Sequence, residues 1–218
     1  MVHLNLFLGV ICDANPYFLI IVTILLAGFP LFPVPFPYFY SAEPIEAWIG
    51  DEESEKPLEG VVIVAAWTLE WNSIAGHMPA GQLKVMETVT DKNGRFYFPA
   101  WGLKLAMNGH LDHETPELTI FKSGYSYKTV SNDLFQKQSG MTRRSDWDSK
   151  NIPLSKFKDS LEEYAKSLTS LSSMLGYNFR TQKNECQWKK IPHMVVALHK
   201  QKSIFDKKIY IKSLLQNS

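Results

Sequence analysis

The chain has 218 residues, of which 45% are hydrophobic and 21% are charged. This composition is ordinary for a globular protein, and it excludes a disordered, collagen-like or disulfide-dense chain. The net charge of +1 conceals an uneven distribution along the chain. Residues 176–218 carry nine Lys/Arg against two Asp/Glu, a local +7, which leaves 14 basic and 20 acidic side chains, a net −6, in residues 1–175. No residue between Asp13 and Glu43 is charged.

An apolar run of 13 residues, Tyr17–Phe29, precedes four closely spaced prolines. Prolines at this density end a helix, and the run is shorter than the roughly 20 residues that span a bilayer. Its length suits the apolar region of a signal peptide cleaved after Ala42, although no Lys or Arg precedes it and Tyr40 stands where a small residue is preferred. The alternatives are an uncleaved anchor that includes the weaker run Leu4–Ile11, and a buried core helix. We therefore assign residues 1–42 as an N-terminal apolar helix, a signal peptide or membrane anchor, with a proline-rich tail.

This N-terminal segment predicts where the protein is located. Both the signal-peptide and the anchor interpretations place the rest of the chain outside the cytoplasm. We expect an exported protein that is periplasmic, secreted, or membrane-anchored and facing the periplasm.

Short β-rich runs separated by turn signals follow from Pro44 onward. The expected strands are Ile45–Ile49, Val61–Trp67, Leu83–Thr90, Arg95–Pro99, Leu118–Phe121 and Tyr125–Val130. The second of these is almost continuously apolar, which is typical of a strand that is buried on both faces or central in a sheet. Asp91-Lys92-Asn93-Gly94 predicts a hairpin between its flanking strands, because Asn and Gly tolerate positive φ. Strands of this length and spacing predict an antiparallel sandwich over residues 43–153.

Three segments carry a resemblance to a known family. They are Trp48–Val62, in which an acidic turn leads to Pro57-Leu58-Glu59-Gly60-Val61, then Glu87–Phe96, and then Phe121–Tyr125. In this order and spacing they resemble the carboxypeptidase regulatory-like domain over residues 43–130. The resemblance implies a mainly β fold, a seven-stranded antiparallel transthyretin-like (prealbumin-like) β-sandwich, of a kind often found as an accessory module in exported bacterial proteins. Glu55 departs from the family, which commonly has Gly at this place, so the conformation of that turn stays open.

The C-terminal part, residues 154–218, is predicted to be a basic helical extension. Seven apolar residues follow alternating spacings of three and four, which places them on one stripe of a helix. They are Leu154, Phe157, Leu161, Tyr164, Leu168, Leu171 and Leu175. Ser155 is placed to cap the start of this helix, and Gly176 lies just past its end. We expect the stripe to pack on the chain's own sandwich, with a coiled-coil dimer as the alternative.

A second short helix, entered through Pro192, has lysine-rich flanks. These lysines predict a solvated face that docks on the acidic sandwich. The alternative is contact with an anionic lipid surface, because clustered Lys near a membrane contributes about 1 kcal/mol each. No nucleic acid is expected, because no aromatic-basic motif accompanies the lysines. The expected partner is an unknown protein or cell-envelope component, together with the membrane if residues 17–29 stay uncleaved.

The densest group of potential metal ligands is His110-Leu111-Asp112-His113-Glu114. The helical pairing His-Glu-x-x-His is absent and no further His or Cys lies near in sequence, so we expect a polar loop. A metal-assisted hydrolase that uses His110 and His113 is the enzyme-class alternative. The four acidic residues within 51–55 are interpreted as an acidic turn, because no spaced calcium-binding loop surrounds them.

We therefore predict no catalytic, cofactor-binding or metal site and no cofactor. The chain has no Gly-x-Ser-x-Gly motif and no Gly-rich phosphate loop, and Cys186 is a lone thiol once Cys12 is removed. Six tryptophans can include a carbohydrate-stacking platform, but most fall on predicted strands, where core packing is commoner. The expected function is a non-enzymatic, exported or membrane-anchored accessory or interaction module. The alternative is a secreted protein that binds a glycan or a small ligand.

Overall fold

The computed structural model describes residues 38–74, 76–107, 109–133, 140–178 and 187–216. They belong to one compact unit, which begins at Pro37. The predictions for Cys12, Tyr17–Phe29 and Cys186 concern residues outside this part of the chain. Within the part that the structure describes, no helix combines the length and apolarity needed to cross a bilayer.

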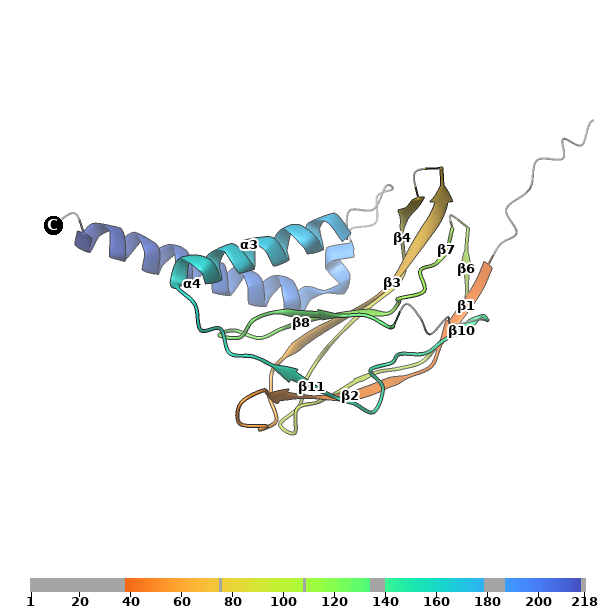
Figure 1. The fold of residues 1–218 in the computed structure, drawn as a ribbon, viewed down its shortest axis with the longest axis horizontal. Coiled ribbons are helices and arrows are strands. Elements are labelled where there is room, and N and C mark those ends of the chain that lie inside the picture. Colours follow the sequence, from red (N-terminus) through yellow and green to blue (C-terminus); the bar gives the residue numbers. More distant parts are fainter. Residues whose placement is uncertain (1–37, 75, 108, 134–139, 179–186, 217–218) are drawn as a thin grey trace, which may run out of the picture. The chain divides into compact units, whose positions relative to one another are not determined.

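The described residues form a mainly β fold, with open sheets and two α-helices (Figure 1). The described strands are β1 (Tyr38–Ala42), β2 (Ile45–Asp51), β3 (Val62–Ser73), β4 (Gly76–Val89), β5 (Arg95–Phe98), β6 (Trp101–Ala106), β7 (His110–Leu111), β8 (Glu117–Phe121), β9 (Lys128–Val130), β10 (Thr142–Arg143) and β11 (Asn151–Leu154). The helices are α3 (Leu161–Asn178), the short 3-10 helix η1 (Gln187–Lys190) and α4 (Pro192–Gln216).

The strands form three sheets. Their orders are β10-β1-β6, β11-β2-β5 and β4-β3-β8-β9, and β7 also pairs with β3. Two pairs, β1 with β10 and β2 with β11, are parallel, so the arrangement is not purely antiparallel as predicted. Both parallel pairs arise because a short strand from late in the chain covers an edge of an earlier one. The described residues also form more strands than the seven predicted.

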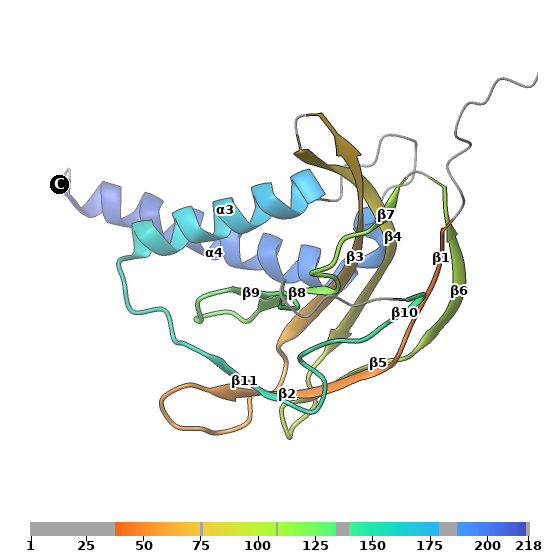
Figure 2. The same cartoon turned by 45° about the vertical axis from the view of Figure 1, so that its right-hand side comes forward.

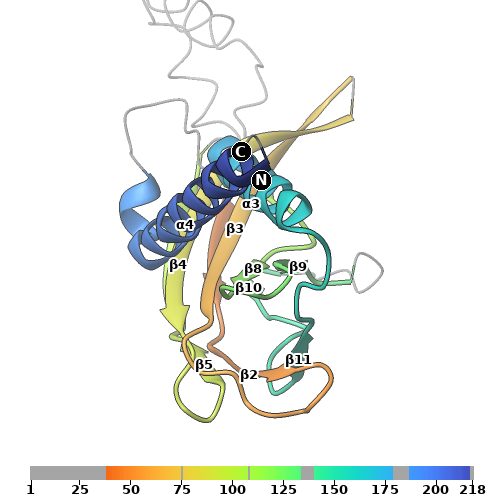
Figure 3. The ribbon, with the colours of Figure 1, turned by 90° about the vertical axis from the view of Figure 1, so that its left-hand side faces the viewer.

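Strand β3 lies between two apolar cores. Ile63, Ala65 and Trp67 belong to the core shared with β2, β5 and β11, whereas Val62 and Val64 belong to a second core shared with the helices. The sheet that contains β3 is therefore a middle layer, with α3 and α4 on one side and the β11-β2-β5 sheet on the other (Figures 1 and 3). This confirms the prediction of a strand buried on both faces.

Strand β1 belongs to the folded core, although the sequence places it in the N-terminal tail. It pairs along its length with β6 (Figure 2). Tyr40 and Ala42 are buried in the core between the sheets. The buried Arg143 guanidinium lies 5.1 Å from the centroid of the Tyr40 ring. The folded unit thus starts upstream of residue 43, because these side chains complete the core.

The turn at Asp91-Lys92-Asn93-Gly94 forms, but the predicted hairpin is wrong. The Gly94 N–H donates to the Asp91 carbonyl at 2.9 Å, with Gly94 at φ 71°. However, β4 pairs with β3, whereas β5 pairs with β2 in another sheet. The Ile49 N–H donates to the Gly94 carbonyl at 2.8 Å, and a Cβ at Gly94 would clash with the Ile49 carbonyl oxygen. Gly94 thus packs closely against β2, and at this turn the chain passes from the sheet that contains β4 to the sheet that contains β2. By contrast, β8 and β9 pair antiparallel as predicted.

The predicted apolar stripe is divided between a strand and a helix. Four of its residues are buried on α3 against the middle sheet: Tyr164, Leu168, Leu171 and Leu175. The prediction that the stripe packs on the chain's own sandwich is therefore confirmed. Leu154 instead lies in β11, where its side chain is buried. Its distance in sequence from the buried residues of α3 matches a helical period only by chance. The cap is Ser160 rather than Ser155, because its hydroxyl accepts from the Glu163 N–H at 3.2 Å. Gly176 lies inside α3 and does not end it.

A buried carboxylate from the sheet holds the start of α4. Glu87 on β4 accepts hydrogen bonds from the backbone N–H groups of His193 at 2.9 Å and Met194 at 2.7 Å, and the His193 Nδ1 lies 2.8 Å from the same carboxylate. The first N–H groups of a helix lack intrahelical acceptors and form the positive end of its dipole, so an anionic acceptor there is stabilising. The helix begins at Pro192 as predicted, but it is not short, because it continues for 25 residues to Gln216.

We predict that Glu87→Ala lowers the free energy of unfolding by about 2 kcal/mol, because two N–H groups at the start of α4 lose a buried, charged acceptor. Urea unfolding followed by circular dichroism measures this change. The control is Glu59→Ala, which removes an exposed carboxylate and should change the free energy of unfolding by less than about 0.5 kcal/mol. Equal effects of the two substitutions would contradict the role of Glu87 as a cap.

Candidate functional site

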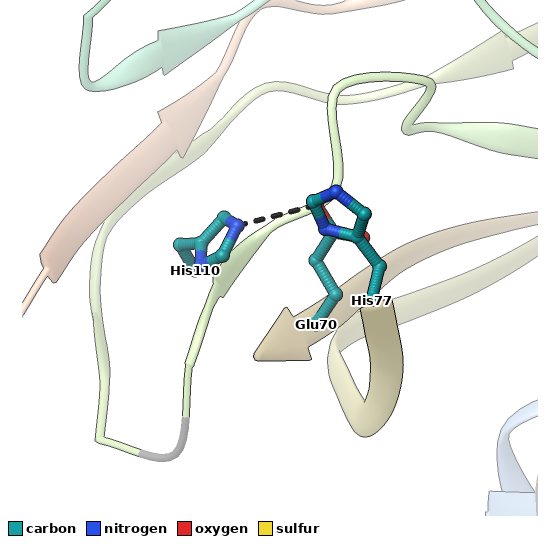
Figure 4. Close-up of side chains that lie close together, drawn as sticks. All are labelled: Glu70, His77 and His110. Atoms are coloured by element: carbon teal, nitrogen blue, oxygen red, sulfur yellow. Dashed lines mark ion pairs between the residues drawn. The ribbon is translucent and has the colours of Figure 1, made fainter. Parts of the chain in front are cut away.

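The candidate site is a cluster of one carboxylate and two imidazoles near the β3–β4 turn (Figure 4). Glu70 lies on β3, His77 on β4 and His110 on β7. The His77 Nδ1 is 3.3 Å from Glu70 Oε2, and the His110 Nε2 is 3.2 Å from Glu70 Oε1. One potential ligand atom from each residue lies within 4.8 Å of the other two.

The strand register explains why these three side chains meet. At this level β3 has β4 on one edge and β7 on the other. Glu70 is opposite His110 on β7 and Pro79 on β4, and His77 is opposite Asn72, two residues further along β3. Residues opposite one another, and residues two apart on a strand, point to the same face of a sheet. Glu70 therefore stands between the two imidazoles.

Gly109 allows β7 to approach β3 closely. Its φ of 138° lies in a region that side chains with a Cβ rarely adopt. A Cβ at this position would also clash with the carbonyl oxygen of Glu70. The residue that precedes His110 must therefore be glycine for the His110 imidazole to reach the Glu70 carboxylate.

The Glu70 carboxylate is more buried than either imidazole. The Glu70 side chain is 14% exposed, that of His110 24% and that of His77 66%. The Tyr38 ring lies edge-on to His110, with 6.4 Å between ring centroids. The cluster is thus enclosed around Glu70 and open to water at His77. Two imidazole nitrogens and one carboxylate in this arrangement can share protons or bind a metal ion.

The structure separates the two histidines that the sequence pairs. His110 joins the cluster, whereas His113 is exposed in a turn outside it. The Glu114 N–H donates to the Asp112 side chain at 2.9 Å, and the Thr115 N–H donates to the Asp112 carbonyl at 3.3 Å. This region is the polar turn that the sequence favours, and the alternative of a His110–His113 metal pair is wrong. Glu70 and His77 were missed because no local spacing links them to His110.

The acidic turn at residues 51–55 is held by internal hydrogen bonds. Asp51 Oδ1 accepts from the Ser54 N–H and hydroxyl, both at 2.8 Å, and Oδ2 accepts from the Tyr125 hydroxyl at 2.9 Å and lies 3.3 Å from the Lys156 ammonium. Hydrogen bonds from Ser54, followed by those from Tyr125 and Lys156, hold the pKa of Asp51 well below its usual range. The carboxylate therefore joins three segments of the fold, as expected of a structural turn.

The tryptophans divide between core and surface. Trp67 and Trp101 are buried and pack edge to face at 5.5 Å. The Lys150 ammonium lies over the Trp147 ring, 5.5 Å from the ring centroid. Two tryptophans are exposed, and they lie on different sheets: Trp48 and Trp71. The described tryptophans thus provide no shared platform for stacking a carbohydrate.

A second candidate feature is an exposed apolar surface on β1 and β6, which we call the β1–β6 surface. It consists of Phe39 on β1 and of Leu103, Leu105 and Met107 on and directly after β6, whose exposure ranges from 42% to 73%. Phe39 and Leu105 are directly opposite one another in the strand register. Neighbouring apolar side chains that face water mark a contact surface more often than isolated ones do.

Positive charge gathers on the other face of β6. Lys104 lies between Leu103 and Leu105, so its side chain points to the face opposite the β1–β6 surface. The pKa of Lys84 on β4 is lowered, mainly by burial and also by the positive charges of Lys104 and Lys190. The ammonium groups of Lys104 on β6 and Lys190 on η1 therefore lie within electrostatic range of Lys84 on β4.

Comparisons with known proteins do not identify the chain. No protein-family model and no curated protein matches it. A solved structure, 3-chlorocatechol 1,2-dioxygenase from Rhodococcus opacus 1CP, is similar at 18% identity and a TM-score of 0.31 over 56% of this chain and 60% of that chain. That protein is an enzyme, and the expectation of a non-enzymatic module is not carried forward. A similarity of this size assigns no activity to the present chain.

We predict that Asp51→Asn destabilises the protein at neutral pH, and that the difference from the unchanged protein shrinks in acid. The pKa of Asp51 is lowered by folding, so its contribution is present above the ordinary Asp pKa of about 3.9 and is lost as the pH falls towards the folded value. Urea unfolding at pH 7, 5 and 3 measures this. A difference between the two proteins that is independent of pH would contradict the prediction.

A second prediction concerns Gly109. Gly109→Ala should lower the free energy of unfolding by roughly 1–3 kcal/mol, because the added Cβ meets the Glu70 carbonyl at a strained φ. Gly102→Ala on β6 is the matched control, since its Cβ would meet nothing within 4 Å. Urea unfolding of both variants measures the contrast. Similar stability of the two would show that β7 does not need the close approach.

Proposed function

We propose that the chain is an exported, membrane-anchored interaction module whose β1–β6 surface lies against the lipid bilayer. The observation that carries the proposal is that this surface begins at Phe39, within the uncharged stretch from residue 14 to residue 42. The carboxypeptidase regulatory-like family and the transthyretin-like topology belong to the same proposal. The mainly β fold with open sheets supports it.

The length of the connecting segment supports this placement. Eight residues, 30–37, separate the apolar run Tyr17–Phe29 from β1. Eight residues extend to at most about 26–29 Å, and to about 25 Å in the polyproline conformation that proline-rich chains favour. The hydrocarbon core of a bilayer is about 30 Å thick. An anchor that includes this run and the weaker run Leu4–Ile11 therefore keeps the β1–β6 surface close to the membrane interface.

The side chains of the surface suit that interface. Phe39 supplies a large aromatic ring whose burial away from water is strongly favourable. When leucine and methionine side chains are withdrawn from water, each Å² of apolar area that is buried contributes roughly 25 cal/mol to the free energy of binding. These apolar and aromatic side chains thus favour a lipid bilayer as the partner.

The role of β1 in the core supports an anchor rather than a signal peptide cleaved after Ala42. Such a cleavage would remove β1, with the buried Tyr40 and Ala42. It would also leave the buried Arg143 guanidinium without the Tyr40 ring that covers it. A fold that needs β1 favours retention of the segment before it.

Single fluorescent labels on the full chain test the proposal. In a Cys12→Ser, Cys186→Ser background, Leu103→Cys carries an environment-sensitive dye, and the protein is reconstituted into vesicles of phosphatidylcholine and phosphatidylglycerol. We expect a blue shift of the emission and quenching by nitroxide-labelled acyl chains. Glu59→Cys, in the exposed loop before β3, is the control and should behave as a water-exposed position.

Two outcomes would contradict the proposal. One is a dye at residue 103 that is no more quenched than the dye at residue 59. The other is a chain that, by intact mass, begins near Glu43 when it is isolated from its host. Retention of Tyr17–Phe29 in the membrane fraction is the expected result.

A further inference from the structure

We propose that Glu70, His77 and His110 form a binding site for a divalent transition-metal ion of the zinc class. The site does not depend on the membrane proposal, because it rests on the contacts of three side chains rather than on the exposed β1–β6 surface. These residues are the group of potential ligands that the described residues bring together around β3.

The ligand chemistry selects the class of metal. Imidazole nitrogens suit zinc, copper, nickel and iron, whereas calcium and magnesium are bound by oxygen ligands. Two histidines and one glutamate are a known zinc ligand set, which leaves a further coordination position for water. The exposed His77 lies on the side where water has access. The expected ion therefore has three protein ligands and an open position that faces the solvent.

The distances fit this set. Zinc–nitrogen and zinc–oxygen bonds of about 2.0–2.1 Å in tetrahedral geometry place neighbouring ligand atoms about 3.3–3.4 Å apart. The two imidazole nitrogens lie 3.2 and 3.3 Å from oxygens of the Glu70 carboxylate. A rotation of the exposed His77 side chain brings the three ligand atoms to one centre, since all lie within 4.8 Å of each other already.

The backbone prepares the site in the protein as it folds. Glu70 is on a central strand, and its two partners come from the strands on either edge, so ladder hydrogen bonds fix the separation of the three Cα atoms. Gly109 permits the close approach of β7. Sites on paired strands hold their geometry better than sites on loops do.

The burial of Glu70 gives a reason for a bound cation. Its side chain is only 14% exposed, and its ion-pair partners among the described residues are the two histidines. A carboxylate withdrawn from water needs a positive charge nearby, and a neutral imidazole supplies only a dipole. A metal ion bound by all three groups supplies that charge while it leaves both imidazoles neutral.

Zinc titration of the full chain in detergent tests the site, in the Cys12→Ser, Cys186→Ser background so that thiolates contribute nothing. We expect one equivalent of Zn²⁺ by calorimetry. His77→Ala, His110→Ala and Glu70→Gln should each weaken binding at least tenfold. His113→Ala, three residues from His110 but outside the cluster, is the matched control and should bind as the unchanged protein does.

Two further readouts separate loss of ligands from loss of structure. Co²⁺ in place of Zn²⁺ should give visible absorption bands of four-coordinate cobalt, which His110→Ala removes and His113→Ala retains. Saturating Zn²⁺ should raise the Tm of the unchanged protein and of His113→Ala but not that of Glu70→Gln, whose side chain keeps the size of glutamate. The proposal is overturned if the unchanged protein binds no zinc at 100 µM, or if His110→Ala and His113→Ala bind it equally well.

Discussion

The burial of β3 on both faces is the constraint on which the rest of the structure depends. Its side chains enter two separate cores, one between the sheets and one beneath the helices. A strand of this kind needs paired neighbours on both edges and an apolar layer above and below it. β4 and β8 meet the first need, and β2 with α3 and α4 meet the second. The Glu87 cap then fixes where α4 starts on this layer.

The same strand explains where the ligand cluster forms. Beyond Leu69 the apolar pattern of β3 ends, and Glu70 follows while the strand still has a neighbour on each edge. A central strand can place one side chain between two others on its face, whereas an edge strand has a neighbour on one side only. Glu70, His77 and His110 therefore meet because β3 stays paired on both edges after its side chains leave the two cores.

Strand β1 connects the two candidate features. Phe39 is part of the exposed β1–β6 surface, whereas the Tyr38 ring, on the other face, lies edge-on to His110 in the cluster. The inward side chains of the same strand, Tyr40 and Ala42, complete the core between the sheets. Five residues thus serve core packing, an exposed surface and the border of a polar cluster, because alternate side chains of a strand point to opposite faces.

The sequence by itself determined the features that depend on local pattern. These are the mainly β middle of the chain, the doubly buried β3, the turn at Gly94, the buried stripe of α3 and the start of α4 at Pro192. The spacing of apolar residues indicates which face of a strand or helix is buried, and turn residues indicate where the chain bends. Both signals depend only on residues that are close in sequence.

Only the tertiary structure decided which strands pair and which side chains meet. The chain after Gly94 joins β2 instead of returning to β4, Leu154 enters a strand instead of a helix, and His110 meets Glu70 and His77 instead of His113. Each outcome depends on a contact between segments far apart in sequence. The free energy of such a contact comes from the packing of whole layers, which no short window of sequence contains.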